Sequence, residues 1–149
     1  MNAPLQRLNF SIHIDAPVET VWDQMLSPDS YRDWTSAFME GSYYEGSWAQ
    51  GSRIRFLSPS GEGMEAEIAE NLRHAYVSIR HLGMVSPQQP PGSGAVPPAY
   101  ENYRFTREAG GTRLDIEQDV PAEYADMMKQ SWPQALDRLK ASSEQAAPR

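Results

Sequence analysis

Apolar and polar residues alternate over much of this chain. The first such segment has apolar residues at Leu8, Phe10, Ile12 and Ile14, separated by polar residues. A period of two is typical of a strand with one buried face. Six later segments also have strand character: 43–48, 53–57, 64–69, 77–82, 103–106 and 114–120. Glycine, proline and serine turns separate several of them, which predicts an antiparallel meander rather than a parallel sheet.

Three other segments have apolar residues at helical spacing. The first follows Pro17, with apolar positions Val18, Val21, Trp22, Met25 and Leu26. A second, shorter one starts at Ser27-Pro28-Asp29 and carries Tyr31 and Trp34. The third starts at Pro121 and has one apolar face formed by Met128, Trp132, Ala135, Leu136 and Leu139. Pro133 lies inside this third segment, which predicts a bend or a new helical start there.

These elements follow one another as a strand, two short helices, six strands and a long helix. Helices segregated from antiparallel strands define an α+β fold. We therefore predict an antiparallel sheet of about six to seven strands together with a long C-terminal helix. No repeat or linker divides the chain, so we predict one domain over residues 1–149, with a core at about 8–140 and a frayed tail at 141–149.

Residues 86–99 have a different composition. They include five prolines and two glycines: Pro87, Pro90, Pro91, Pro97, Pro98, Gly92 and Gly94. This composition predicts a loop without strand or helix. A long structureless loop in a compact domain is either functional, for example a lid, or a tolerated surface insertion.

Composition narrows the classes of function. The chain has no cysteine, which excludes disulfides, thiolate metal sites and cysteine nucleophiles. Its formal net charge of −7 argues against a nucleic-acid partner. It has neither a signal-peptide pattern at its start nor an apolar run of the ~20 residues that span a bilayer. We therefore expect a cytoplasmic protein without a membrane span.

Four motifs occur in a consistent order along the chain. They are Ile14-Asp15-Ala16-Pro17-Val18-Glu19-Thr20-Val21-Trp22, Tyr31-Arg32-Asp33-Trp34, Tyr103-Arg104-Phe105-Thr106 with the following Gly110-Gly111 turn, and Trp132-Pro133-Gln134-Ala135-Leu136-Asp137-Arg138-Leu139-Lys140. Together they resemble the SRPBCC (START-like, helix-grip) superfamily. The last motif is similar to the branch named for the activator of the heat-shock-protein ATPase.

The resemblance implies the helix-grip fold, in which a curved antiparallel sheet surrounds the long C-terminal helix. It implies no single function. Relatives in the superfamily include lipid carriers, hormone receptors, polyketide cyclases, chaperone cofactors and many bacterial proteins. The proline-rich segment 86–99 departs from the shorter connection that the resemblance leads us to expect.

The polar residues indicate little chemistry. The three histidines, His13, His74 and His81, share no ligand spacing, so we predict no metal site and no cofactor. Glu65 and Glu67 alternate with apolar residues and are expected on a solvated outer face. No nucleophile elbow or phosphate-binding loop is present, so we assign no catalytic residue.

His81 is the polar residue of most interest. It alternates with Val77 and Ile79, which predicts that it points inward. It is then either a polar group inside an apolar cavity or a core histidine bonded to a backbone or tyrosine partner.

Helix-grip folds often enclose a cavity between the sheet and the last helix. The residues expected to line it are Trp34, Phe38, Trp48, Phe56, Met64, Ile79, His81, Tyr103, Met127, Met128 and Trp132. Apolar walls with a few polar groups are typical of small-molecule sites. Alternatively, these side chains fill the space themselves.

Three hypotheses of function follow. The first is binding of a small hydrophobic or aromatic molecule, oriented by His81 and Tyr103. The second, drawn from the resemblance, is a protein-interaction module whose partner is a chaperone or another protein. The third is an enzyme of the cyclase or hydrolase kind that uses an inward His81 as general acid or base.

Overall fold

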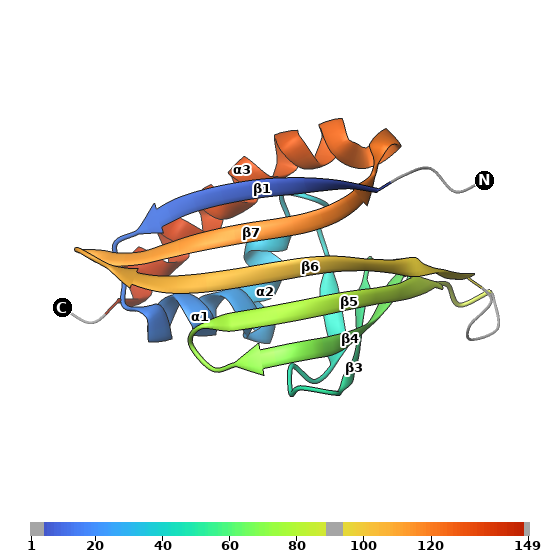
Figure 1. Ribbon diagram of the computed structural model, residues 1–149, viewed down its shortest axis with the longest axis horizontal. Coiled ribbons are helices and arrows are strands. Elements are labelled where there is room, and N and C mark those ends of the chain that lie inside the picture. Colours follow the sequence, from blue (N-terminus) through green and yellow to red (C-terminus); the bar gives the residue numbers. More distant parts are fainter. Residues whose placement is uncertain (1–4, 89–93, 148–149) are drawn as a thin grey trace.

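The computed structural model describes residues 5–88 and 94–147. Within these residues the elements are β1 (Leu5–Ile14), α1 (Val18–Leu26), α2 (Pro28–Thr35), β2 (Tyr43–Gly46), β3 (Arg53–Leu57), β4 (Gly63–Leu72), β5 (Tyr76–Val85), β6 (Gly94–Glu108), β7 (Gly111–Pro121) and α3 (Ala122–Ala146). Figure 1 shows the curved sheet in front and the helices behind it. The α+β helix-grip architecture predicted from the sequence is confirmed.

All neighbouring strands pair antiparallel, in the order β1-β7-β6-β5-β4-β3-β2. The first strand of the chain, β1, therefore lies beside the last one, β7. Both α1 and α2 are inserted between β1 and β2, and they lie on the same face of the sheet as α3 (Figure 1). The apolar core lies between this inner face and the helices.

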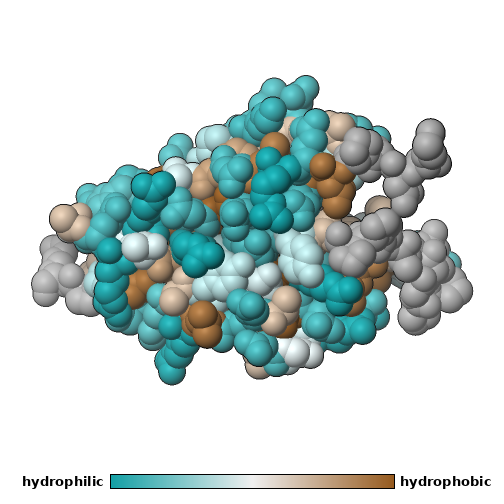
Figure 2. Space-filling model, viewed as in Figure 1, coloured by the Kyte–Doolittle hydropathy of each residue, from teal (hydrophilic) through white to brown (hydrophobic). Residues whose placement is uncertain are grey.

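The outer face of the sheet carries mostly hydrophilic side chains, as Figure 2 shows. Arg53 on β3 lies beside Glu65 and Glu67 on β4, with nitrogen–oxygen distances of 3.6 and 4.0 Å. The solvated position predicted for these two glutamates is therefore confirmed. Exposed ion pairs of this kind contribute little to stability. The outer face of the sheet is therefore a solvated surface.

Helix α3 runs without interruption through Pro133 and onward to Ala146. Pro133 is exposed, so the backbone carbonyl that loses its partner can be hydrated. The helix also includes most of the tail that was expected to be frayed. Ser143 is completely buried there, and Lys140 donates to the His13 carbonyl at 3.2 Å. Packing against β1 thus orders residues that composition alone does not mark as structured.

Strand β6 begins at Gly94, so the prediction that no strand forms within 86–99 is wrong for its second half. Gly83 pairs with Ala95 and His81 with Ala99, which leaves residues 96–98 between the two paired positions. Pairing of β6 with β7 starts only at Glu101. Proline is tolerated in strands at such bulges and unpaired edges. The remaining prolines at 90 and 91 lie outside the described residues.

No helix in the described part of the chain combines the length and the apolar character needed to cross a membrane.

Candidate functional site

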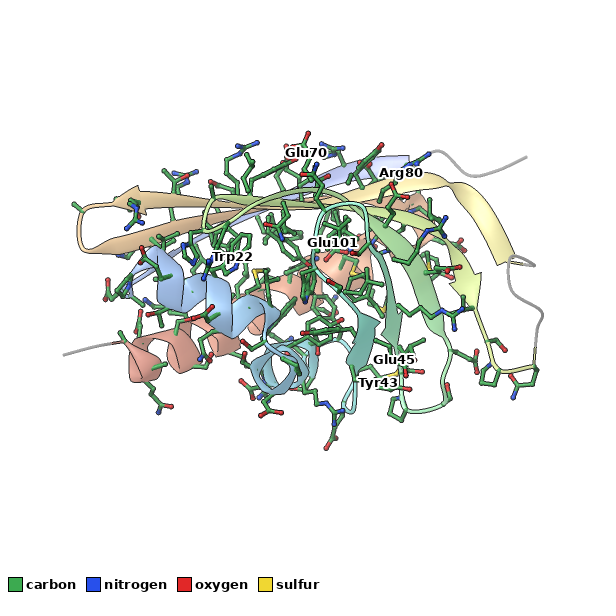
Figure 3. All side chains as sticks on the ribbon, turned by 90° about the horizontal axis from the view of Figure 1, so that it is seen from below. Trp22, Tyr43, Glu45, Glu70, Arg80 and Glu101 are labelled. Carbon is green, nitrogen blue, oxygen red and sulfur yellow. The ribbon has the colours of Figure 1, made fainter. Side chains whose placement is uncertain are left out.

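A buried carboxylate is the centre of the site. Glu101 lies on β6 and points into the space between the sheet and the helices, whereas Glu70 and Arg80 point away on the outer face (Figure 3). His81 Nε2 is 3.1 Å from Glu101 Oε1, and Gln118 Nε2 donates to the same oxygen at 3.3 Å. The Tyr103 hydroxyl donates to Glu101 Oε2. These four side chains are called the Glu101 cluster below.

The sheet register brings the cluster together. Glu101 on β6 lies directly opposite Gln118 on β7, and His81 on β5 and Tyr103 on β6 each lie two residues from this row. Because side chains two residues apart share a face of a strand, all four point inward. Trp132 on α3 donates from Nε1 to Gln118 Oε1 at 2.8 Å, which joins the cluster to the helix.

The hydrogen bonds decide the charge of the cluster. Burial alone raises the pKa of Glu101, but the hydrogen bonds from His81, Tyr103 and Gln118, with the attraction of His81, outweigh it and lower that pKa. Burial, followed by the nearby charge of Glu101, raises the pKa of Tyr103 well above its ordinary value. Glu101 is therefore ionised and accepts hydrogen bonds, while the Tyr103 hydroxyl keeps its proton and donates.

Two polar atoms near the cluster have no hydrogen-bond partner among the described residues. They are His81 Nδ1 and Trp48 Nε1, and both are buried. The rings of both residues contact Phe56, with centroids 5.8 Å and 5.7 Å from its ring. A buried polar atom without a partner costs about 1–3 kcal/mol, and native structures usually supply one as a water, an ion or a ligand.

An apolar row lies next to these atoms on the inner face. Tyr44, Phe56, Met64 and Met84 occupy paired positions on β2, β3, β4 and β5. A bulge at Leu82 allows both His81 and Met84 to point inward, although they are three residues apart. Met84 is 59% exposed, and Phe56 and Met64 are half-buried, so this end of the inner face is incompletely covered. We call these four residues the apolar row.

Residues 15–144 match the model of a family described as Activator of Hsp90 ATPase homolog 1-like protein. The chain belongs to this family. The match confirms the resemblance inferred from the sequence. No curated protein matches the chain.

Several solved structures share this fold. A protein from Mesorhizobium loti has a TM-score of 0.74 at 18% identity, with 96% of this chain and 100% of that chain covered. An AHSA1-like protein from Aeromonas hydrophila has a TM-score of 0.65 at 16% identity, over 95% and 94% of the two chains. DynU16, from the dynemicin biosynthetic locus, has a TM-score of 0.71 at 16% identity, over 95% of this chain and 48% of its own. At these identities the likeness shows the fold alone.

In this AHSA1-like chain, seven of the eleven residues expected to line a cavity form one series of aromatic contacts. Trp34, Phe38, Tyr103 and Trp132 contact one another, and Trp48, Phe56 and His81 form a second group. Tyr31 connects the groups, because its ring contacts both Trp34 and Phe56. Much of the expected cavity is therefore occupied by the side chains themselves.

The other four predicted residues differ in their placement. Ile79 is fully buried on the inner face, Met64 belongs to the apolar row, and Met128 packs against the core. Met127 is 51% exposed and lies outside both clusters of packed apolar side chains. The structure does not place Met127 beside the other residues that were expected to line the cavity.

Two open hollows of about 370 and 380 Å³ lie elsewhere on the surface of the AHSA1-like domain. One is formed between the start of α1 and the β6–β7 turn, and the other over β1, β6 and β7. Neither includes a residue of the predicted set or of the Glu101 cluster. The described residues also contain no group of three histidine or carboxylate side chains suited to a metal ion.

The sequence interpretation missed Glu101 and Gln118. One of the two alternatives for His81 was a core histidine bonded to a backbone or tyrosine partner, and its side-chain partner in the structure is instead the Glu101 carboxylate. A signal was present in the sequence. Alternation from Tyr103 and Phe105 places Glu101 on the inner face, and alternation from Leu114 and Ile116 places Gln118 there.

Proposed function

We propose that this protein binds a small hydrophobic or aromatic molecule between the inner face of the sheet and α3. One observation carries the proposal: Phe56 of the partly open apolar row contacts His81 of the buried Glu101 cluster, close to polar atoms that have no partner among the described residues. Apolar walls that converge on a few oriented polar groups are typical of ligand sites. The ligand would lie along the apolar row, with its polar end toward His81.

Half-buried apolar side chains are suited to making room for a ligand. Phe38, Phe56 and Met64 are only half-buried, and methionine adapts its shape at low energetic cost. Removing roughly 200 Å² of apolar ligand surface from water contributes about 5 kcal/mol at 25 cal/mol per Å². That gain must exceed the cost of immobilising the ligand, so we expect modest affinity unless the polar groups add to it.

Native mass spectrometry of the gently purified protein gives the first test. We expect an adduct of a few hundred daltons, and compounds of its class should raise the melting temperature. A bare protein mass, together with no thermal shift from a panel of lipids and aromatic compounds, overturns the proposal.

A matched pair of variants locates the site. Met84 and Leu72 are 59% and 58% exposed, but Met84 lies on the inner face and Leu72 in an outer row of the sheet. We expect Met84→Asp to weaken the ligand-induced thermal shift and Leu72→Asp to leave it unchanged. Equal effects of the two substitutions contradict the assignment to the inner face.

A second candidate function is acid–base catalysis at the same position. The observation that favours it is the hydrogen bond between an ionised, buried carboxylate and an imidazole, an arrangement that can orient a general base. If a bound compound is converted, His81→Gln should abolish turnover yet retain binding, because glutamine still donates to Glu101. Unchanged turnover eliminates the candidate. The chaperone-partner hypothesis stays a prediction from the resemblance.

A further inference from the structure

We infer that Met84 is an oxidation site that regulates the proposed ligand site. Conversion of its sulfur to the sulfoxide weakens ligand binding, and reduction of the sulfoxide restores it. This inference rests on the proposed function, because the ligand would lie along the apolar row to which Met84 belongs. Three features support it: the exposure of Met84, its neighbours in the sheet and the chemistry of the sulfoxide.

The side chain of Met84 is open to a dissolved oxidant. It is 59% exposed, the highest value among the large apolar side chains that the structure describes. Met25 is fully buried, and Met64 and Met128 are half-buried. Because oxidation of a sulfur by a dissolved oxidant requires access to it, peroxide should react with Met84 before it reacts with these three.

The register of the sheet explains this exposure. Met84 lies opposite Met64 on β4 and opposite Gly94 on β6. Glycine has no side chain, so β6 provides nothing to cover Met84 at the paired position. Val85 is the last residue of β5, so Met84 also lies at the end of its strand. Met84 is therefore the open end of the apolar row.

Oxidation changes the polarity of this end of the row. A peroxide transfers one oxygen atom to the thioether sulfur, which loses two electrons, and the peroxide is reduced to water or an alcohol. The sulfoxide is polar, and its oxygen accepts hydrogen bonds from water while the site is empty. An apolar ligand would cover that oxygen without supplying a donor, which is unfavourable. Oxidation therefore favours the empty site, and methionine sulfoxide reductases can reverse it.

Met127 provides a comparison within the same chain. Its side chain is 51% exposed, so it should oxidise about as readily as Met84. It lies on α3, outside both clusters of packed apolar side chains and outside the apolar row. A sulfoxide at Met127 leaves the row unchanged. Comparison of the two positions therefore separates an effect at the site from the effect of oxidation in general.

Binding of one neutral apolar probe before and after oxidation tests the inference. Fluorescence titration with N-phenyl-1-naphthylamine would measure the affinity, and peptide mass spectrometry would report the sulfoxide at each methionine. We expect mild peroxide treatment to weaken binding about tenfold, the equivalent of about 1.4 kcal/mol, and reduction by methionine sulfoxide reductases to restore it. Whatever the starting affinity of Met84→Leu, peroxide should not change it. Met127→Leu should respond to peroxide as the unmodified protein does.

Protection from oxidation gives a second measurement, which needs no variant. A saturating concentration of the probe should slow sulfoxide formation at Met84 and leave the rate at Met127 unchanged in the same sample. An unchanged rate at Met84 overturns the inference, because the bound probe then does not cover this residue.

The titrations also separate the inference from the proposed function. Equal affinities before and after oxidation of Met84 overturn the inference and leave the proposed function standing. A loss of affinity that persists in Met84→Leu assigns the effect to another residue and overturns the inference as well. If the probe does not bind the untreated protein, the proposed function fails for this ligand class and the inference fails with it.

Discussion

The indole rings of Trp34 and Trp132 stack with their centroids 5.8 Å apart and their planes 26° from parallel. This contact joins α2 to α3 above the inner face of the sheet. Each ring is also held by its nitrogen: Trp34 Nε1 donates to the Met25 carbonyl at 2.9 Å and Trp132 Nε1 to Gln118 at 2.8 Å. The two tryptophans are therefore structural anchors, and room for the proposed ligand must come from their half-buried neighbours.

Replacement of Trp132 tests this anchoring role. We expect Trp132→Ala to lower the free energy of unfolding by about 3–5 kcal/mol, because it leaves a cavity between α3 and the sheet. Trp132→Phe keeps most of the volume and should cost roughly 1–2 kcal/mol for the lost bond to Gln118. Urea denaturation measures both values. Tyr124→Ala, at an exposed position of the same helix, is the control, and a similar effect there contradicts the anchoring role.

The sequence predicted the order of strands and helices because the evidence for each element is local, and the family resemblance supplied their helix-grip arrangement. Alternation identifies each strand, and helical spacing identifies each helix, without knowledge of their partners. His81 was placed on the inner face for the same reason. Its partner Glu101 is 20 residues away in sequence, and only the β5–β6 register brings the two together. Glu101 is also a charged residue, and charged residues usually face water. Alternation alone therefore did not predict that it points inward.

The strand around Pro97 and Pro98 shows a second limit of prediction from the sequence. Composition predicts the intrinsic preference of a segment, whereas pairing with an existing strand can override that preference wherever the prolines need not donate. The bulge at Leu82 is similar, because it reverses the alternation of β5 and turns Met84 inward. Neither irregularity has a signature that a single sequence reveals, since both depend on the neighbouring strand.

A substitution of Gly63, at the start of β4, tests the close approach of β3 and β4. A Cβ atom there would lie 1.9 Å from the Phe56 carbonyl oxygen, which is backbone and cannot rotate aside. We expect Gly63→Ala to destabilise the protein by about 1–3 kcal/mol and to disturb the apolar row. Thermal unfolding measures this effect. The exposed neighbour variant Glu62→Ala should stay within about 0.5 kcal/mol of the unmodified protein. Equal stability of the two variants contradicts the close approach.

At the opposite end of the sheet, we expect the stabilisation that His13 contributes to depend on pH. Hydrogen bonds to Glu108 and then Asp15 raise the pKa of His13 above 6.5. Because the pKa is raised in the folded state, the stabilisation is complete below 6.5 and disappears as the pH rises through the raised value. His13→Gln should therefore lower the melting temperature more at about pH 5.5 than at about pH 8.5. A nuclear magnetic resonance titration should also show a lower His13 pKa in Glu108→Gln. An unchanged titration contradicts the pairing.

In the interior, we expect the stabilisation that Glu101 contributes to have the opposite pH dependence. Its pKa is lowered from 4.5 in the folded state, so its stabilisation is present above that value and disappears as the pH falls through the lowered pKa. At neutral pH, Glu101→Gln should cost about 1–3 kcal/mol, because an amide cannot accept from His81, Tyr103 and Gln118 as a carboxylate does. We expect this cost to shrink as the pH drops below 4.5 in urea titrations. The same exchange at exposed Glu123 controls for the loss of one negative charge. A cost that is independent of pH shows that Glu101 is not ionised in the folded protein, and the hydrogen-bond assignments at His81 then fail as well.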